Sequence, residues 1–393
     1  MARSTRTRLT RSLALALATA SSVGVAATSA ASANADVSTT SSVKTRAQVP
    51  WASVGTGWVA ADVVRGGVNH LVLASPGGQA YEIATLAKNE VVVAISHDGK
   101  HVATQRPNSS DGLPHPRVWD MRTGKASNLP INLSNLTFTR PNGTAVMGFN
   151  EVNSYGRYST SGTQQRVVTA GRSGVGDYPV ITPNPNGLTD AVTSTRAGRS
   201  SVSLYNHAGF TKARTFSQPT GSQGCTATGW KNTTTLIETC DIRGKNGVAA
   251  PQVFAQNIAG GAPKALTSGT YPGGDAYSGF SDAADTSIGT LAMTASPYGG
   301  DFGGTVFRLS GTKATTKVGP SSVNPNGGAY AGGYATKIVG DKILYASSPM
   351  GGRSTKRMVA EYDVRTKKLT YLVGNNSKYT GEVNGYAVID PRA

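Results

Sequence analysis

The feature that most constrains the fold is a strand–turn–strand unit that occurs seven times along the chain. Each unit has an apolar strand, a turn that typically contains Gly or Asn, and a basic or polar second strand. The units start at His70, Arg117, Gly156, Ser201, Gln252, Thr305 and Met358. Their starts are 39 to 53 residues apart. Shorter apolar runs between the units complete about four strands in each repeat, and helical periodicity is absent beyond the N-terminal segment.

The stretch from Val91 to Pro130 shows the whole repeat. VVVAIS and HVATQR flank the tight turn HDGK, and RVWDM and a strand near ASNLP flank the turn RTGK. Repeats of four antiparallel strands predict an all-β chain, a β-propeller of seven four-stranded blades over residues 50–393. A ring of six or eight blades, or a β-sandwich with an extra domain, is the alternative. We expect the last strand, Gly385 to Asp390, to pair with the first unit around residues 49–58 and so close the ring.

Two phrases in the repeat carry a resemblance to a known family. AISHDGKHVAT, from Ala94 to Thr104, and VWDMRTGK, from Val118, resemble the turns of TolB-like and WD40-like bacterial propellers, with His97 in place of the usual Pro. The resemblance implies the fold. The Asp and Gly of these phrases form turns and imply no chemistry. The family includes scaffolds, translocation components and propellers attached to peptidases, so it does not imply one function. The sequence has no α/β-hydrolase segment, which weighs against a peptidase.

The N-terminus indicates export. Four arginines precede an apolar run from Leu13 to Ala27, and small residues follow up to Ala35. We therefore expect a secretory signal peptide over residues 1–35 and a flexible leader over residues 36–49. Removing the signal lowers the formal charge from +17 to +13, because it removes four arginines and no acids. No other apolar run is long enough to span a membrane. The mature protein is expected to be secreted, possibly wall-associated, and monomeric.

The two cysteines are expected to form a disulfide in an oxidising compartment. A hairpin that turns at Asn232-Thr233 would place Cys225 opposite Cys240. Nothing near them resembles a thiol active site.

Long loops predict where a ligand binds. The loops between second and third strands are long, and they share one face with the loops between blades, whereas the turns between first and second strands are short. Basic and aromatic residues in these loops suit sugars and phosphates through forked hydrogen bonds and stacking. The candidate ligand-binding residues are Arg106, Arg117, Arg157, Arg243, Arg353, Lys356, Arg357 and Tyr298.

Signals of catalysis are sparse. The five histidines show no zinc-ligand spacing, and no G-x-S-x-G motif is present. Only one group of acids suits a cation, and it lacks EF-hand spacing, so no cofactor is expected beyond a possible calcium ion. These acids are Asp275, Asp282, Asp285 and Asp301. Asp111 and Glu151 could form a glycosidase-like pair if the fold brought them together.

The sequence therefore favours a non-catalytic propeller that binds a protein or an anionic cell-envelope polymer, with no specific nucleic-acid partner. The alternative is a carbohydrate- or peptide-acting hydrolase or lyase with its site at the axial mouth.

Overall fold

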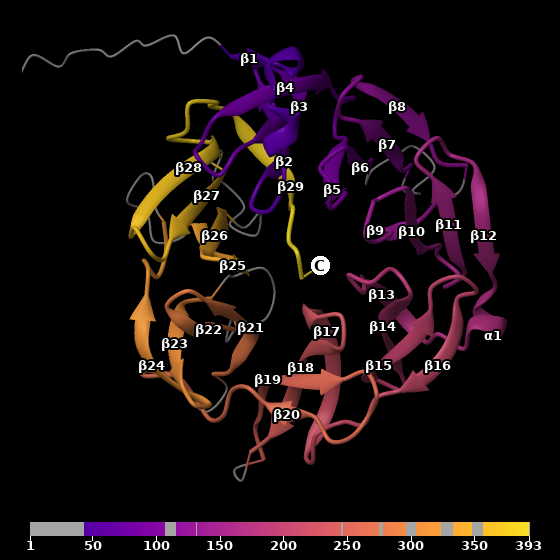
Figure 1. Ribbon diagram of the computed structural model, residues 1–393, viewed down its shortest axis with the longest axis vertical. Helices are drawn as coiled ribbons and strands as arrows, with labels where there is room; N and C mark the ends of the chain where they lie inside the picture. The colour runs from indigo at the N-terminus through magenta and orange to yellow at the C-terminus, as the bar shows by residue number, and fades with distance from the viewer. Residues whose placement is uncertain are drawn as a thin grey trace, which may run out of the picture. The chain divides into compact units, whose positions relative to one another are not determined.

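The computed structural model describes residues 43–106, 115–130, 132–244, 247–274, 278–295, 304–323, 333–347 and 357–392. Within them, seven β-sheets form a seven-bladed β-propeller, which confirms the predicted fold and blade number (Figure 1). The helices are η1 (Arg46–Gln48), η2 (Trp51–Ser53) and α1 (Ala170–Ser173). None of the helices found in these ranges has the length and apolar character needed to cross a membrane. The expected signal peptide lies outside the described residues.

Blades 2 to 7 each consist of four consecutive strands. Blade 2 contains β5 (Val91–Ile95), β6 (His101–Gln105), β7 (Arg117–Asp120) and β8 (Lys125–Asn128). Blade 3 contains β9 (Ser134–Phe138), β10 (Ala145–Phe149), β11 (Tyr155–Ser159) and β12 (Gln164–Val168). Blade 4 contains β13 (Asp177–Pro183), β14 (Thr189–Arg196), β15 (Arg199–Asn206) and β16 (Thr211–Thr215). Blade 5 contains β17 (Ser222–Asn232), β18 (Thr235–Arg243), β19 (Ala249–Asn257) and β20 (Lys264–Ala265). Blade 6 contains β21 (Phe280–Thr286), β22 (Gly289–Thr294), β23 (Val306–Ser310) and β24 (Lys313–Val318). Blade 7 contains β25 (Gly333–Val339), β26 (Lys342–Ser347), β27 (Met358–Asp363) and β28 (Lys368–Gly374).

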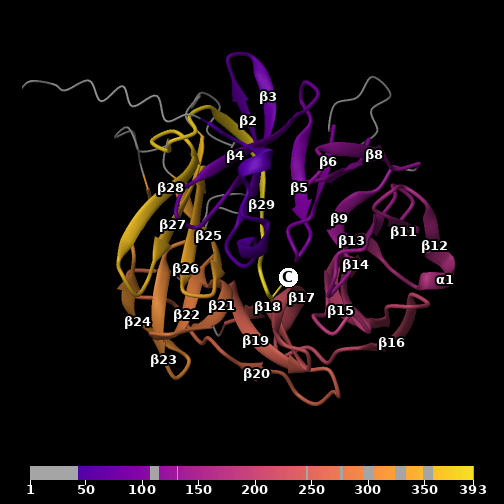
Figure 2. The ribbon, with the colours of Figure 1, turned by 45° about the horizontal axis from the view of Figure 1, so that its top comes forward.

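Blade 1 is built from both ends of the described chain. It contains β1 (Lys44–Thr45), β2 (Val59–Arg65), β3 (Val68–Ala74), β4 (Ala80–Thr85) and the late strand β29 (Glu382–Val388). The strand order is β1-β4-β3-β2-β29. The predicted ring closure is thus confirmed, because β29 pairs antiparallel with β2 (Figure 2).

The predicted partner of the last strand needs a correction. Val388 pairs with Val59, and the pairing continues to Glu382 opposite Val64. Of the expected partner segment 49–58, only Gly57 and Trp58 take part, through backbone bonds of 2.9 Å to Ile389. The run 59–64 forms an uninterrupted strand, whereas the segment before it contains Pro50, Gly55 and Gly57, which interrupt strand pairing.

The expected leader is partly structured. Lys44 and Thr45 form β1, which pairs parallel with Tyr81 and Glu82 at the outer edge of blade 1. Val49 is buried with the core between blades 1 and 2. The folded domain therefore starts before residue 50, and the expected boundary moves towards the N-terminus.

Neighbouring blades pack their apolar faces against each other. Trp58 and Leu73 of blade 1 meet Trp119 of blade 2 in one such cluster. On the innermost strand, Gly385 leaves room for blade 2, since a Cβ there would lie 2.6 Å from the carbonyl oxygen of Val92. This close approach explains why the strand nearest the axis carries a glycine at that position.

The disulfide between Cys225 and Cys240 is present, as predicted. The two residues are direct partners on β17 and β18. The predicted turn is displaced by one residue, because Asn232 pairs with Thr235. Bulges between Trp230 and Asn232 and between Ala227 and Gly229 restore the register that brings the cysteines together.

Candidate functional site

Exposed arginines gather at the end of the propeller that carries the turns between second and third strands. Because neighbouring strands of a blade are antiparallel, these turns lie at the same end in every blade. In the described ranges, these arginines have no acidic side chain within ion-pairing distance. We call this set the arginine face: Arg65, Arg106, Arg196, Arg199 and Arg243.

The contacts of the arginine face with described residues leave its charge uncompensated. Arg65 lies over the ring of Tyr379, 5.5 Å from its centroid. Arg243 donates a hydrogen bond of 3.4 Å to the neutral side chain of Gln223. Each contact orients the guanidinium of its arginine, and neither partner carries a negative charge that would neutralise it.

Three other predicted ligand-binding arginines are engaged within the propeller. The Nη1 atom of Arg117 lies 3.1 Å from the carboxylate of Glu90, whose side chain is fully buried. Arg157 donates to the carbonyl oxygen of His207 in blade 4, at 3.0 Å. Arg357 donates to Asn384 of β29, also at 3.0 Å. These side chains hold strands and blades together, so they are not part of the arginine face.

The remaining predicted ligand residues, Arg353, Lys356 and Tyr298, lie outside the described residues. So do Asp111, Asp275 and Asp301.

The opposite end of the propeller carries the turns between first and second strands and between third and fourth strands, and lysines and acids lie there side by side. We call it the short-turn face. Several of its lysines are paired with acids at short distance. The pairs are Lys100–Asp98 (2.8 Å), Lys231–Asp285 (2.7 Å) and Lys342–Asp363 (2.7 Å). The hydrogen bond from Lys342 holds the pKa of Asp363 well below its usual range.

The segment after β29 enters the centre of the ring. We call Ile389–Arg392 the axial tail, and Figure 1 shows the chain ending among the blades. Lys337 of blade 7 lies 3.1 Å from the carboxylate of Asp390. Arg140 of blade 3 donates to the carbonyl oxygen of Pro391 at 2.6 Å. The backbone N–H of Trp230 in blade 5 donates to the carbonyl oxygen of Arg392 at 2.7 Å. The tail thus connects several blades near the axis.

A pocket of about 310 Å³ lies beside the axial tail. We call it the axial pocket. Its walls come from the first strands of blades 2, 3 and 7 and from β29 with the tail. The polar side chains that line it include His97, Arg140, Lys337 and Asp390.

The axial pocket lacks the acid–histidine arrangement of a hydrolase in the described part of the chain. The Nδ1 atom of His97 is buried and has no hydrogen-bond partner. Burial, with a smaller effect from the charge of Arg140, lowers the pKa of His97. Asp390 lies near two cations, Lys337 at 3.1 Å and Arg392 at 3.6 Å. Its carboxylate is therefore held as a counter-ion and is poorly placed to orient His97 as a base.

Histidine–acid pairs do occur elsewhere on the blades. His207 Nδ1 lies 2.8 Å from Asp190 Oδ2 in blade 4, and His70 Nδ1 lies 3.0 Å from Glu82 in blade 1. Neither pair lines the axial pocket. Both pairs join strands of one blade, which is a structural role.

Two of the four acids considered for calcium lie in the described part of the chain, and both form ion pairs with basic side chains. Asp282 forms a two-bond ion pair with Arg392. Asp285 lies 2.7 Å from Lys231. Glu151, the other half of the proposed glycosidase pair, is exposed on the loop between β10 and β11.

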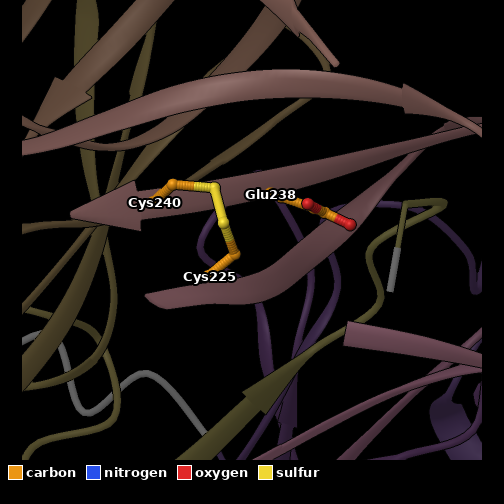
Figure 3. Close-up of side chains that lie close together, drawn as sticks. All are labelled: Cys225, Glu238 and Cys240. Atoms are coloured by element: carbon orange, nitrogen blue, oxygen red, sulfur yellow. A yellow bond between two sulfur atoms is a disulfide. The ribbon is translucent and has the colours of Figure 1, made fainter. Parts of the chain in front are cut away.

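One buried acid stands beside the disulfide. Figure 3 shows the side chain of Glu238 next to Cys225 and Cys240. The ligand-type atoms of these three residues lie within 4.8 Å of one another. Both sulfurs are used in the disulfide, so the group does not provide thiolate ligands to a metal. Glu238 Oε1 is buried without a partner, and burial raises the pKa of this carboxyl to about 8.

Sequence reasoning missed the axial residues. The sequence indicates only a turn role for His97, and Asp390 is expected at the end of the last strand, with no role assigned to the residues after it. A usable signal exists in retrospect: Asp390 and Arg392 are charged residues directly after the innermost strand, where a chain that continues must meet the axis.

Comparison with protein-family models and with curated proteins gives no match. Solved structures do match. TolB from Acinetobacter baumannii has a TM-score of 0.45 at 14% identity, covering 85% of this chain and 67% of its own. The C-terminal WD40 domain of Sif2 has a TM-score of 0.42 at 13% identity, covering 84% and 82%. Prolyl oligopeptidase B from Galerina marginata has a TM-score of 0.51 at 9% identity, covering 84% and 52%. This chain thus spans about half the length of that enzyme. At these identities the likeness is one of fold, and the chain resembles TolB and WD40 propellers at that level.

Proposed function

We propose that the protein is a secreted, non-catalytic β-propeller that binds an anionic polymer of the cell envelope through its arginine face. The observation that carries this proposal is the set of exposed arginines at one end of the propeller. Among the described residues, no arginine of the arginine face has an acidic partner, whereas the short-turn face carries both paired lysines, such as Lys100 and Lys231, and unpaired ones. A surface that keeps its positive charge available attracts a polyanion at low ionic strength.

The spacing of the arginines suits an extended ligand. They come from blades 1, 2, 4 and 5, so a compact ligand would reach only some of them. Guanidinium groups bind phosphate and carboxylate oxygens in pairs, which favours a polymer with repeated anionic groups. Arg353 and Lys356 remain proposed members of the same surface. A protein with an acidic surface is the alternative partner.

Secretion is part of the proposal. The disulfide is of a kind that persists in oxidising compartments, and the N-terminal segment has the pattern of a signal peptide. The paired state of Asp390 and the unpartnered His97 favour binding over the hydrolase alternative.

The test is chromatography on an immobilised polyanion, such as heparin, with elution by salt. The face variant carries Arg106→Gln, Arg196→Gln and Arg199→Gln. The control carries Lys212→Gln, Lys313→Gln and Lys368→Gln, exposed lysines at turns between third and fourth strands. Both lose three positive charges, so net charge alone predicts equal behaviour. We expect only the face variant to elute at clearly lower salt. Equal elution of the two variants would contradict a specific face.

A second experiment distinguishes a polymer ligand from a protein partner. Binding of the wild type to poly(glycerol phosphate) and to a carboxylated polysaccharide is measured by the same salt series. Retention of neither polymer at low salt would overturn the polyanion proposal.

A further inference from the structure

The charges around the axial tail do not balance. Arg392 is paired with Asp282, at 2.9 Å, and Lys337 with Asp390, at 3.1 Å. Arg140 is the third cation of this group. No carboxylate of the described residues lies within 4.0 Å of its guanidinium. The described groups therefore leave one positive charge uncompensated beside the axial pocket.

Arg140 is also incompletely hydrogen-bonded. The residue is only 8% exposed, and its Nη2 atom donates to the backbone oxygens of Asp390 and Pro391. Its Nε atom is buried and has no acceptor. Burial lowers the pKa of the guanidinium, with Asp390 acting in the opposite direction. A buried donor without an acceptor and a buried charge without a counter-ion are both destabilising, and an anion beside the guanidinium would supply the missing counter-charge.

A second polar atom in the same pocket lacks a partner. His97 lines the axial pocket with Arg140, and its Nδ1 atom is buried and unpartnered. An imidazole nitrogen can donate to an anion when it carries the proton. The two side chains come from the turns after the first strands of blades 2 and 3, which are neighbouring blades.

The rest of the pocket has a mixed lining, in which Thr137 and Tyr386 carry polar groups. Its apolar lining comprises Val93, Ala94, Ile95, Leu136, Phe138, Ala387 and Val388. The volume of about 310 Å³ is at the lower end of the range for small-molecule pockets. A ligand of this site would be small, with one anionic end and an apolar body.

We propose that the axial pocket binds a small monocarboxylic acid, with its carboxylate on Arg140 and His97 and its apolar body against Leu136 and Phe138. One excess positive charge matches a monoanion better than a phosphate dianion. A flat carboxylate suits the edge of a guanidinium, and the apolar part of the lining gives a hydrocarbon or aromatic body a surface to pack against. This site is separate from the arginine face and does not depend on the function proposed for that face.

Titration calorimetry on the full propeller tests the proposal. The probes are benzoate, its neutral analogue benzamide, and inorganic phosphate. We expect benzoate to bind, benzamide to bind at least ten-fold more weakly, and phosphate to bind more weakly than benzoate. Equal binding of benzoate and benzamide, or tighter binding of phosphate, would overturn the assignment.

Variants locate the site. Arg140→Met keeps the length of the side chain and removes the charge, and we expect it to weaken benzoate binding at least ten-fold. Arg199→Met, on the arginine face, is the matched control and should bind as the wild type does. Val93→Phe, which keeps Arg140 and narrows the pocket, should also weaken binding. It provides the decisive measurement if Arg140→Met does not fold. Unchanged affinity in the folded variants would contradict the proposal.

Discussion

The guanidinium of Arg392 forms two parallel hydrogen bonds with the carboxylate of Asp282, Nη1 to Oδ1 at 3.1 Å and Nη2 to Oδ2 at 2.9 Å. The two residues are 110 positions apart in the sequence. Arg392 follows the innermost strand of blade 1, and Asp282 belongs to the first strand of blade 6. Both side chains are nearly buried, with exposed fractions of 12% and 8%. The pair therefore anchors the axial tail to the first strand of blade 6.

Removing one partner of this pair should be strongly destabilising. Arg392→Met leaves the carboxylate of Asp282 buried without its counter-ion, which typically costs about 3–5 kcal/mol. We expect the urea midpoint of unfolding to fall accordingly. The double variant Arg392→Met/Asp282→Asn removes both charges and should recover a large part of the loss. A double variant as unstable as the single one would show that the ion pair is not the source of the effect.

The disulfide should stabilise the protein by reducing the conformational entropy of the unfolded chain. It joins residues 15 positions apart, and a loop of that size corresponds to about 3 kcal/mol in the chain-entropy model. We expect Cys225→Ala/Cys240→Ala to lower the free energy of unfolding by about that amount. Denaturation of the wild type with and without a thiol reductant is the matched control. A reduced wild type that unfolds at the same denaturant concentration as the oxidised protein would contradict this prediction.

The fold was predictable because its signals are local. The turns HDGK and RTGK of blade 2 each join adjacent strands, and turn chemistry depends on a few neighbouring residues. The cysteine pairing was predicted correctly although the turn was displaced, because two bulges on β17 compensated for the displacement. Bulges depend on packing against the next blade, so the sequence pattern does not reveal them.

The functional surfaces were less predictable because they depend on contacts between distant segments. Arg117 donates a hydrogen bond to Glu90, which lies in the connection between blades 1 and 2. Arg157 donates to the carbonyl oxygen of a residue 50 positions away in the sequence. Both arginines match the pattern of exposed loop residues in the sequence. Only the folded arrangement separates them from Arg196 and Arg199, which remain exposed.

Arg117 provides a direct check of that distinction. Its guanidinium lies over the ring of Trp119, 4.8 Å from the centroid, and the indole N–H of Trp119 donates to Thr104 and Glu90. Arg117→Met removes the counter-ion of the buried Glu90, so we expect a loss of about 2–4 kcal/mol in unfolding free energy. Because Arg117 is not part of the arginine face, the salt concentration that elutes the protein from an immobilised polyanion should change little.

The matched comparison is Arg106→Met in the same blade. Arg106 is exposed, and no contact of its side chain is recorded among the described residues. This variant should have the unfolding free energy of the wild type and should elute from the polyanion at a lower salt concentration. The reverse pattern, with Arg117→Met weakening retention and leaving stability intact, would return Arg117 to the ligand-binding set.

Glu238 should make the stability of the protein depend on pH. Burial raises its pKa from 4.5 to about 8, so the folded state binds its proton more tightly than the unfolded state does. The associated stabilisation is complete below about pH 4.5 and is lost as the pH rises towards 8. Since one pKa unit corresponds to about 1.4 kcal/mol, the loss is at most on the order of 5 kcal/mol.

Glu238→Gln keeps the shape of the side chain and removes its titration. We expect the variant and the wild type to have similar unfolding free energies near pH 4.5, and the variant to be increasingly more stable up to about pH 8. Asp62 and Glu361, with pKa values raised by burial to about 6 and about 7, act in the same direction in both proteins. The difference between variant and wild type therefore isolates Glu238. A constant difference across this pH range would mean that Glu238 does not change its protonation on unfolding.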